Sequence, residues 1–120
     1  MLVGMARLFL RVDLQPQGRI GPGKIALLEE IGRSGSISAA GRALGMSYRR
    51  AWLLVDELNK LLGAPVVATQ LGGSHGGGAS LTALGSDLVA RFRALEQAAA
   101  PLVREHLGPL EAMAARSASE

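Results

Sequence analysis

The chain has 120 residues, of which 48% are hydrophobic and 3% aromatic, enough for one domain with a single modest core built mainly from Leu, Val, Ile and Ala. It contains no cysteine, which excludes disulfides, Cys-based metal sites and a thiol nucleophile. The formal net charge is only +3, so the distribution of charge along the chain tells more than its sum.

Basic residues are concentrated in one part of the chain. Between residues 19 and 50, the only acids are Glu29 and Glu30, and they face the cations Arg19, Lys24, Arg33, Arg42, Arg49 and Arg50. Residues 1–14 are interrupted by charges and contain no apolar run long enough for a secretory signal or a membrane span. We therefore expect a soluble, cytoplasmic protein with no membrane partner. Its basic region suits a negatively charged binding partner.

The first predicted elements are a strand, a loop and a helix. Residues 7–14 alternate as a half-buried strand does, and the positions on its apolar face are Leu8, Leu10, Val12 and Leu14. Residues 15–23 are rich in Pro and Gly and predict a loop. A short amphipathic helix follows over about 23–33, with apolar positions Ile25, Leu27, Leu28 and Ile31 and an end at Gly32 and Gly35.

Two further helices follow with a tight turn between them. Ser36 can cap a short helix over 37–44, and Gly45 supplies a left-handed stop. Ser47 can cap a helix over about 48–62, whose apolar stripe consists of Ala51, Leu54, Val55, Leu58, Leu61 and Leu62. A turn of about three residues that contains glycine is typical of a helix-turn-helix.

A hairpin and a long helix complete the predicted fold. Short strands over 66–71 and 79–81 flank a glycine-rich tip at 72–78, and Thr82 caps a helix from about 83. Pro101 is expected to kink or interrupt that helix, Gly108-Pro109 to break it again, and residues 114–120 to fray. The fold class is mainly α with a small β-hairpin, a winged helix-turn-helix. The expected domains are 1–107, with the long helix, and a partly frayed tail at 108–120.

The start of the 48–62 helix poses an electrostatic problem. A helix N-terminus carries positive potential and disfavours an exposed cation by roughly 0.3–1 kcal/mol, yet Arg49 and Arg50 lie there. In a winged helix-turn-helix this helix enters the major groove, where phosphates and guanine edges supply the missing negative partner. The residues predicted to contact double-stranded DNA are Ser36, Ser38, Arg42, Ser47, Tyr48, Arg49 and Arg50, with Ser74, His75 and Gly76 on the wing.

Bland interpretations compete with these functional ones. The arginines can be solvated or paired with acids, the serines can serve only as helix caps, and the wing can be an unattached loop. Trp52 is expected in packing more than at DNA. The long helix carries an apolar series that predicts a homodimer interface, namely Leu84, Leu88, Phe92, Leu95, Leu102 and Leu107. Its alternative is packing against helix 23–33 within one chain.

Catalytic, metal and cofactor sites find no support in the pattern. The glycines at 72–77 lack the Lys-Ser/Thr that completes a nucleotide-binding loop. His75 and His106 are too far apart for metal-ligand spacing, and adjacent acids such as Asp56 and Glu57 point in different directions on a helix. We expect no enzyme, no metal site and no cofactor.

The stretches GSISAAGRALGMSYRRAWLLVDELNKL and LGGSHGGGASLTALG resemble the N-terminal DNA-binding domain of the ModE-type molybdate-responsive regulators, a winged helix with a LysR-like helix-turn-helix. The resemblance covers about residues 6–107. It implies a homodimeric transcription factor that binds an inverted repeat and dimerises through the long helix and the N-terminal region. Members usually continue into a molybdate-binding domain, so we expect no molybdate site within this chain. Their wing often carries Arg or Lys, whereas this one offers Thr69, Ser74 and His75.

Other functional classes remain open at this stage. A winged helix can also serve as a protein-interaction module, or bind DNA without sequence preference. A third class, a sensor with a small-ligand pocket at a dimer interface, finds no anchoring residues in the sequence.

Overall fold

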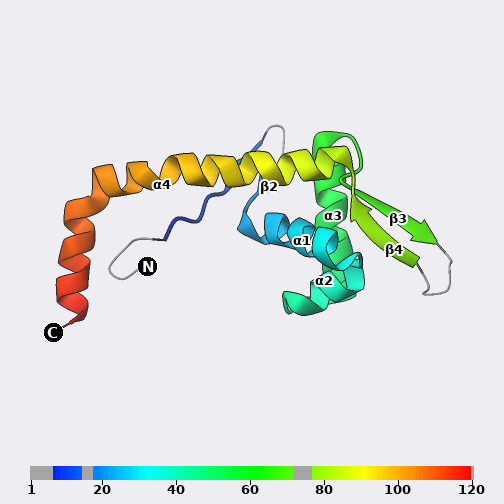
Figure 1. The fold of residues 1–120 in the computed structure, drawn as a ribbon, viewed down its shortest axis with the longest axis horizontal. Coiled ribbons are helices and arrows are strands. Elements are labelled where there is room, and N and C mark those ends of the chain that lie inside the picture. The colour runs from blue at the N-terminus through cyan, green and yellow to red at the C-terminus, as the bar shows by residue number, and fades with distance from the viewer. Residues whose placement is uncertain (1–6, 15–17, 72–76, 120) are drawn as a thin grey trace.

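The computed structural model describes residues 7–14, 18–71 and 77–119. Along the chain lie β1 (Val12–Asp13), β2 (Arg19–Ile20), α1 (Pro22–Ser34), α2 (Ile37–Ala43), α3 (Tyr48–Leu62), β3 (Val67–Leu71), β4 (Gly77–Leu81) and α4 (Ala83–Ala118). In Figure 1, α4 lies across the bundle of α1, α2 and α3, and the β3–β4 hairpin projects from one end. This is the predicted winged helix-turn-helix.

Local signals set the ends of the helices as predicted. The side chains of Ser36, Ser47 and Thr82 accept hydrogen bonds from backbone N–H groups of the first turns of α2, α3 and α4, at 3.0, 3.0 and 3.1 Å. Gly45, in the turn between α2 and α3, has a φ of 71°, the left-handed conformation that glycine adopts without steric cost. The bounds of α1, α2 and α3 agree with the sequence prediction to within about a residue.

The core forms around α1. Its Ile25, Leu27, Leu28 and Ile31 are fully buried, and the predicted stripe of α3 closes over them through Ala51, Val55 and Leu58. From the other side α4 adds Phe92. Burying a Leu or Ile side chain stabilises the fold by roughly 1.5–3 kcal/mol, so these residues hold the helix-turn-helix together.

The N-terminal strand is shorter than predicted. Only Val12–Asp13 pairs as β1, with Val12 opposite Ile20 and Asp13 opposite Arg19, so β2 lies inside the stretch expected to be a loop. Burial still alternates over residues 7–13, but Leu14, expected on the buried face, is exposed. A strand needs a partner for its backbone hydrogen bonds, and β2 offers only two residues.

The hairpin is longer on its second strand than predicted. Gly77 and Gly78, expected in the tip, belong to β4 and pair with Leu71 and Gln70. The backbone N–H of Ala79 donates to the carbonyl of Gly35 at 2.8 Å, which attaches β4 to the junction of α1 and α2. This contact fixes the wing relative to the helix-turn-helix.

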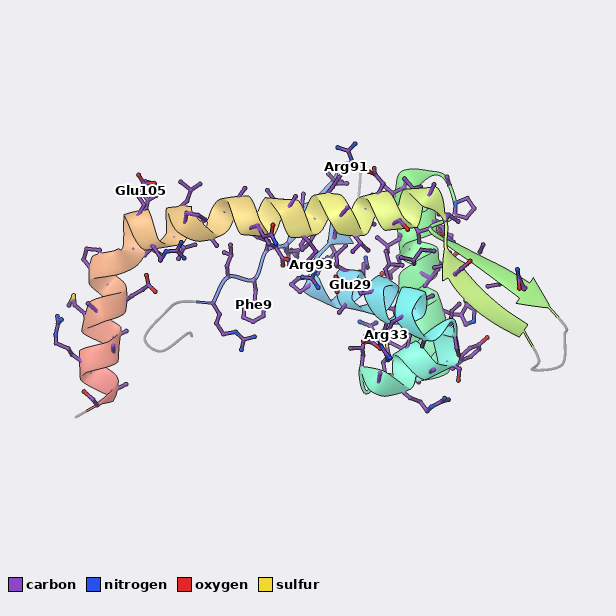
Figure 2. The ribbon with its side chains drawn as sticks, in the orientation of Figure 1. Phe9, Glu29, Arg33, Arg91, Arg93 and Glu105 are labelled. Atoms are coloured by element: carbon purple, nitrogen blue, oxygen red, sulfur yellow. The ribbon has the colours of Figure 1, made fainter. Side chains whose placement is uncertain are left out.

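The long helix is not broken by its prolines. α4 continues through Pro101 and Pro109 to Ala118, so the expected break at Gly108-Pro109 is wrong, and Pro101 does not interrupt the helix. The fraying expected for residues 114–120 stays a prediction. Its axis does change direction near Glu105 (Figures 1 and 2). Glu105 lies four residues before Pro109, where the proline ring meets the preceding turn. None of the helices in the described ranges is long and apolar enough to cross a membrane.

Candidate nucleic-acid interface

The first turn of α3 presents positive charge to the solvent. Ser47 caps it, and it contains no acidic residue. Tyr48 is 57% exposed, and Arg49 and Arg50 are also exposed. Within the described ranges, neither guanidinium has a hydrogen-bond or ion-pair partner. The cations therefore add to the potential of the helix start without internal compensation.

Arg49 and Arg50 point in different directions. Successive residues of an α-helix are about 100° apart. Arg49 lies on the outer face of α3, which also carries exposed Leu53 and an ion pair between Lys60 and Asp56 at 2.9 Å. Arg50 lies on a flank of α3 and lines a cleft shared with β2 and α1. The two arginines that sequence reasoning treated together thus reach different surroundings.

Tyr48 is held by its neighbour one turn later. The rings of Tyr48 and Trp52 meet edge to face, with centroids 6.4 Å apart and an interplanar angle of 79°. Trp52 is half-buried and packs against the core, in line with the packing role expected for it. An edge-to-face pair of this kind is worth about 0.5–1.5 kcal/mol, which restrains the exposed Tyr48 ring.

The start of α2 forms the second polar region. Ser36 uses its oxygen as the helix cap, and Ser38 Oγ accepts a hydrogen bond from Arg42 at 2.8 Å. That bond occupies one of the five N–H donors of the exposed Arg42 guanidinium. Ser34, which sequence reasoning missed, donates from its Oγ to the carbonyls of Glu30 and Ser36 at 2.8 and 3.1 Å and so fixes the junction of α1 and α2.

The remaining predicted contacts have different outcomes. The predicted wing contacts Ser74, His75 and Gly76 lie outside the described residues. Phe92 was predicted to lie in a dimer interface, but it is 4% exposed and belongs to the core of its own chain. Leu84 and Leu88 pack against that core. Leu95, Leu102 and Leu107 are 44%, 52% and 46% exposed and stay available for a partner.

Two buried or bridging cations escaped sequence reasoning. Lys24 is almost fully buried, and its Nζ donates to the carbonyl of Arg19 at 2.8 Å and pairs with Glu57 at 3.2 Å. Arg93 on α4 reaches down to Glu29 on α1 with two hydrogen bonds of 2.9 and 2.6 Å (Figure 2), and also binds Glu96. Hydrogen bonding to Arg93 lowers the pKa of Glu29, against the opposing effect of partial burial.

Metal binding finds no support in the geometry. Over residues 7–14, 18–71 and 77–119, no group of three or more His, Cys, Asp or Glu side chains could hold an ion. The side chains that reach solvent at the starts of α2 and α3 are cations, hydroxyls and one aromatic ring.

The element order and the exposed cations at the start of α3 define a protein of the winged helix-turn-helix class. Residues 23–86 match the model of the bacterial regulatory helix-turn-helix proteins of the lysR family, and the chain belongs to that family.

Named relatives agree with the resemblance to ModE-type regulators. The chain is 51% identical over 85 residues to the molybdenum-pterin-binding protein MopB of Rhodobacter capsulatus, covering 71% of this chain and 32% of that protein. It is 40% identical over 92 residues to the molybdenum transport protein ModE of Azotobacter vinelandii, covering 77% and 33%. It is 38% identical over 92 residues to the DNA-binding transcriptional dual regulator ModE of Escherichia coli K12, covering 77% and 35%. The chain thus spans about a third of the length of these relatives.

Proposed function

We propose that this chain is a sequence-specific transcriptional regulator that binds an inverted-repeat operator as a homodimer, with α3 in the major groove. The observation that carries the proposal is the uncompensated positive start of α3. Arg49 and Arg50 gain a partner only when an anion approaches, and double-stranded DNA offers both phosphates and guanine acceptors at that position.

Each region of the interface has a distinct task in this proposal. Arg49, on the outer face of α3, reads a base edge, and a bidentate arginine–guanine contact discriminates by about 1–3 kcal/mol. Tyr48, steadied by Trp52, directs its hydroxyl to a phosphate. Ser36, Ser38 and Arg42 at the start of α2 contact backbone phosphates, which fix the register of the protein on the duplex.

The distal part of α4 supports the homodimer. Leu95, Leu102 and Leu107 continue an apolar series beyond the point where the helix covers its own core, and Leu110 and Met113 extend it. A second copy of the same helix would bury these side chains, and two-fold symmetry would place two copies of α3 on two half-sites. Sedimentation that shows a monomer at micromolar concentration would remove this part of the proposal.

The test is selection of bound duplexes from a random DNA pool at near-physiological salt, followed by sequencing. We expect enrichment of a two-fold symmetric site. Enrichment of a single half-site would contradict the dimer, and no enrichment would contradict sequence-specific binding.

One observation favours a protein-interaction module as the second candidate. Leu53 is 47% exposed on the outer face of α3, between the arginines and the Lys60–Asp56 pair, and an exposed apolar residue there suits a protein partner. Retention on heparin separates the two candidates, because DNA binding predicts strong, salt-sensitive retention and a protein-binding face does not.

A further inference from the structure

A cleft of about 890 Å³ runs along one flank of α3, away from its outer face. Its walls are the start of α1, strand β2 and the side of α3 that begins at Arg50. The residues lining it are Gly18, Arg19, Gly21, Gly23, Lys24, Arg50, Leu54, Glu57, Lys60 and Leu61.

The cleft has a strongly positive lining. Among the described residues that line it, Glu57 is the one acid, and the cations are Arg19, Lys24, Arg50 and Lys60. Glu57 pairs with Lys24, and Lys60 pairs with Asp56 outside the lining. In the described part of the chain, the exposed guanidinium groups of Arg19 and Arg50 have no acidic partner. The bond from Lys24 goes to the backbone carbonyl of Arg19 and leaves its guanidinium unpaired. The cleft therefore holds charge that an external anion can neutralise.

Several contacts join the walls of the cleft. A Cβ on Gly18 would lie 2.5 Å from Cδ1 of Leu61, so the backbone before β2 sits directly on the end of α3. The buried Lys24 joins β2 to α3 through its bonds to the Arg19 carbonyl and Glu57. Because these contacts tie the three walls together, Arg19 is held beside the same flank of α3 as Arg50.

The shape and lining favour a polyanion over a small molecule. Apart from Leu54, Leu61 and the glycines, the lining side chains are charged, and four of these five are cations, which suits a ligand with several phosphates. From Arg50 to Lys60 the cleft follows α3 for about 15 Å at the helical rise, a length that spans several phosphates of one DNA strand. It also begins at the turn of α3 that carries the proposed base-reading residue.

We propose that this cleft is a second, sequence-independent DNA site, in which the phosphate backbone at one rim of the major groove contacts Arg50 and Arg19. The inference rests on the proposed function, since it needs DNA on α3. It extends the footprint to β2, an element outside the helix-turn-helix and the wing.

The first test is Arg19→Ala, with Arg91→Ala as the matched control. Arg91 is also an exposed arginine, but it lies on the upper side of α4, away from α2 and α3 (Figure 2). Binding to the selected operator is measured between about 50 and 200 mM salt, a range over which phosphate contacts change affinity strongly. We expect Arg19→Ala to reduce the salt slope by about one per bound chain, with base preference unchanged, and Arg91→Ala to leave both unchanged. Equal slopes for Arg19→Ala and the wild type would overturn the inference.

The second test removes the carboxylate of Glu57 from the lining of the cleft. Glu57→Gln removes a negative charge from the lining and should bind the operator severalfold more tightly with a steeper salt slope, whereas Asp87→Asn, which removes a carboxylate paired with Arg91 on α4, should not. Circular dichroism and sedimentation confirm that each variant keeps its fold and oligomeric state. An increase of the same size in both variants would reveal only a general charge effect and would contradict a local contact.

The outcomes separate the inference from the function on which it rests. A wild-type protein that selects no DNA site contradicts the proposed function. A wild-type protein that binds its site while Arg19→Ala behaves like Arg91→Ala contradicts the cleft alone. Saturable binding of inorganic phosphate that depends on Arg19, with DNA affinity unchanged in Arg19→Ala, would identify a small-anion site and also overturn the inference.

Discussion

The two halves of α4 differ in the burial of their apolar side chains. In the half that lies over α1, Phe92 is buried and Leu84 and Leu88 pack against the core. In the half beyond it, Leu102, Leu107 and Leu110 are about half exposed. Both halves have apolar residues at helical spacing, so the difference lies in what covers them. The helix-turn-helix completes its own core within one chain, and the distal half of α4 has apolar surface left for another.

The largest expected effect is on the core of the helix-turn-helix, which the first half of α4 covers. Leu28→Ala removes a fully buried side chain from α1 and should lower the free energy of unfolding by about 2–5 kcal/mol. Leu102→Ala, the matched change on the distal half, should alter unfolding of the single chain by roughly 0.5 kcal/mol or less while weakening self-association. Urea unfolding, with sedimentation of each variant, measures both quantities. Equal losses in the free energy of unfolding would show that Leu102 is covered within its own chain as Leu28 is.

The next largest effect concerns DNA binding by α3 of the helix-turn-helix. Arg49→Ala should weaken specific binding by about 1–3 kcal/mol and relax the base preference at one position per half-site. Arg104→Ala, an exposed arginine on the distal half of α4, serves as the control and should leave binding to the selected operator unchanged. Binding curves on the operator and on single-base variants measure the change. Unchanged affinity for Arg49→Ala with an intact fold would contradict its placement at a base edge.

The sequence predicted what local physics determines. Caps at Ser36, Ser47 and Thr82, the left-handed Gly45 and the stripe of α3 all depend on neighbours within a turn or two, and each was confirmed. What covers an apolar face depends on the whole fold. Periodicity alone therefore placed Phe92 in a dimer interface, although it belongs to the core of its own chain.

The missed features of the site have the same cause. Arg93 and Glu29 are 64 residues apart, and no spacing rule predicts their pairing. The burial of Lys24 requires β2, which sequence reasoning placed inside a loop. Arg49 and Arg50 were recognised as important, but their separate surroundings depend on how α3 sits against α1 and β2.

A smaller effect tests the cap that begins α3. Ser47→Ala removes the acceptor for the Arg50 backbone N–H and should lower the free energy of unfolding by about 1 kcal/mol. Ser47→Asp should restore the cap, and Asp also favours the positive helix start, but its charge would repel a phosphate. We therefore expect Ser47→Asp to recover stability without recovering DNA affinity. Recovery of both would show that the hydroxyl acts only as a cap.

The smallest expected effect is the pH dependence of the contact that joins α4 to α1. Hydrogen bonds from Arg93 lower the pKa of Glu29 below its ordinary value of 4.5, so the stabilisation is present above that value and is lost as the pH falls through the lowered, folded-state pKa. Because the Arg93 and Glu29 side chains are 37% and 40% exposed, the contribution should be about 1 kcal/mol or less. Thermal melts of the wild type and Glu29→Gln should therefore differ at pH 7, and the difference should shrink as the pH is lowered through the carboxylate range. A difference that stays constant as the pH is lowered would mean that Glu29 stabilises the junction through packing and not through its charge.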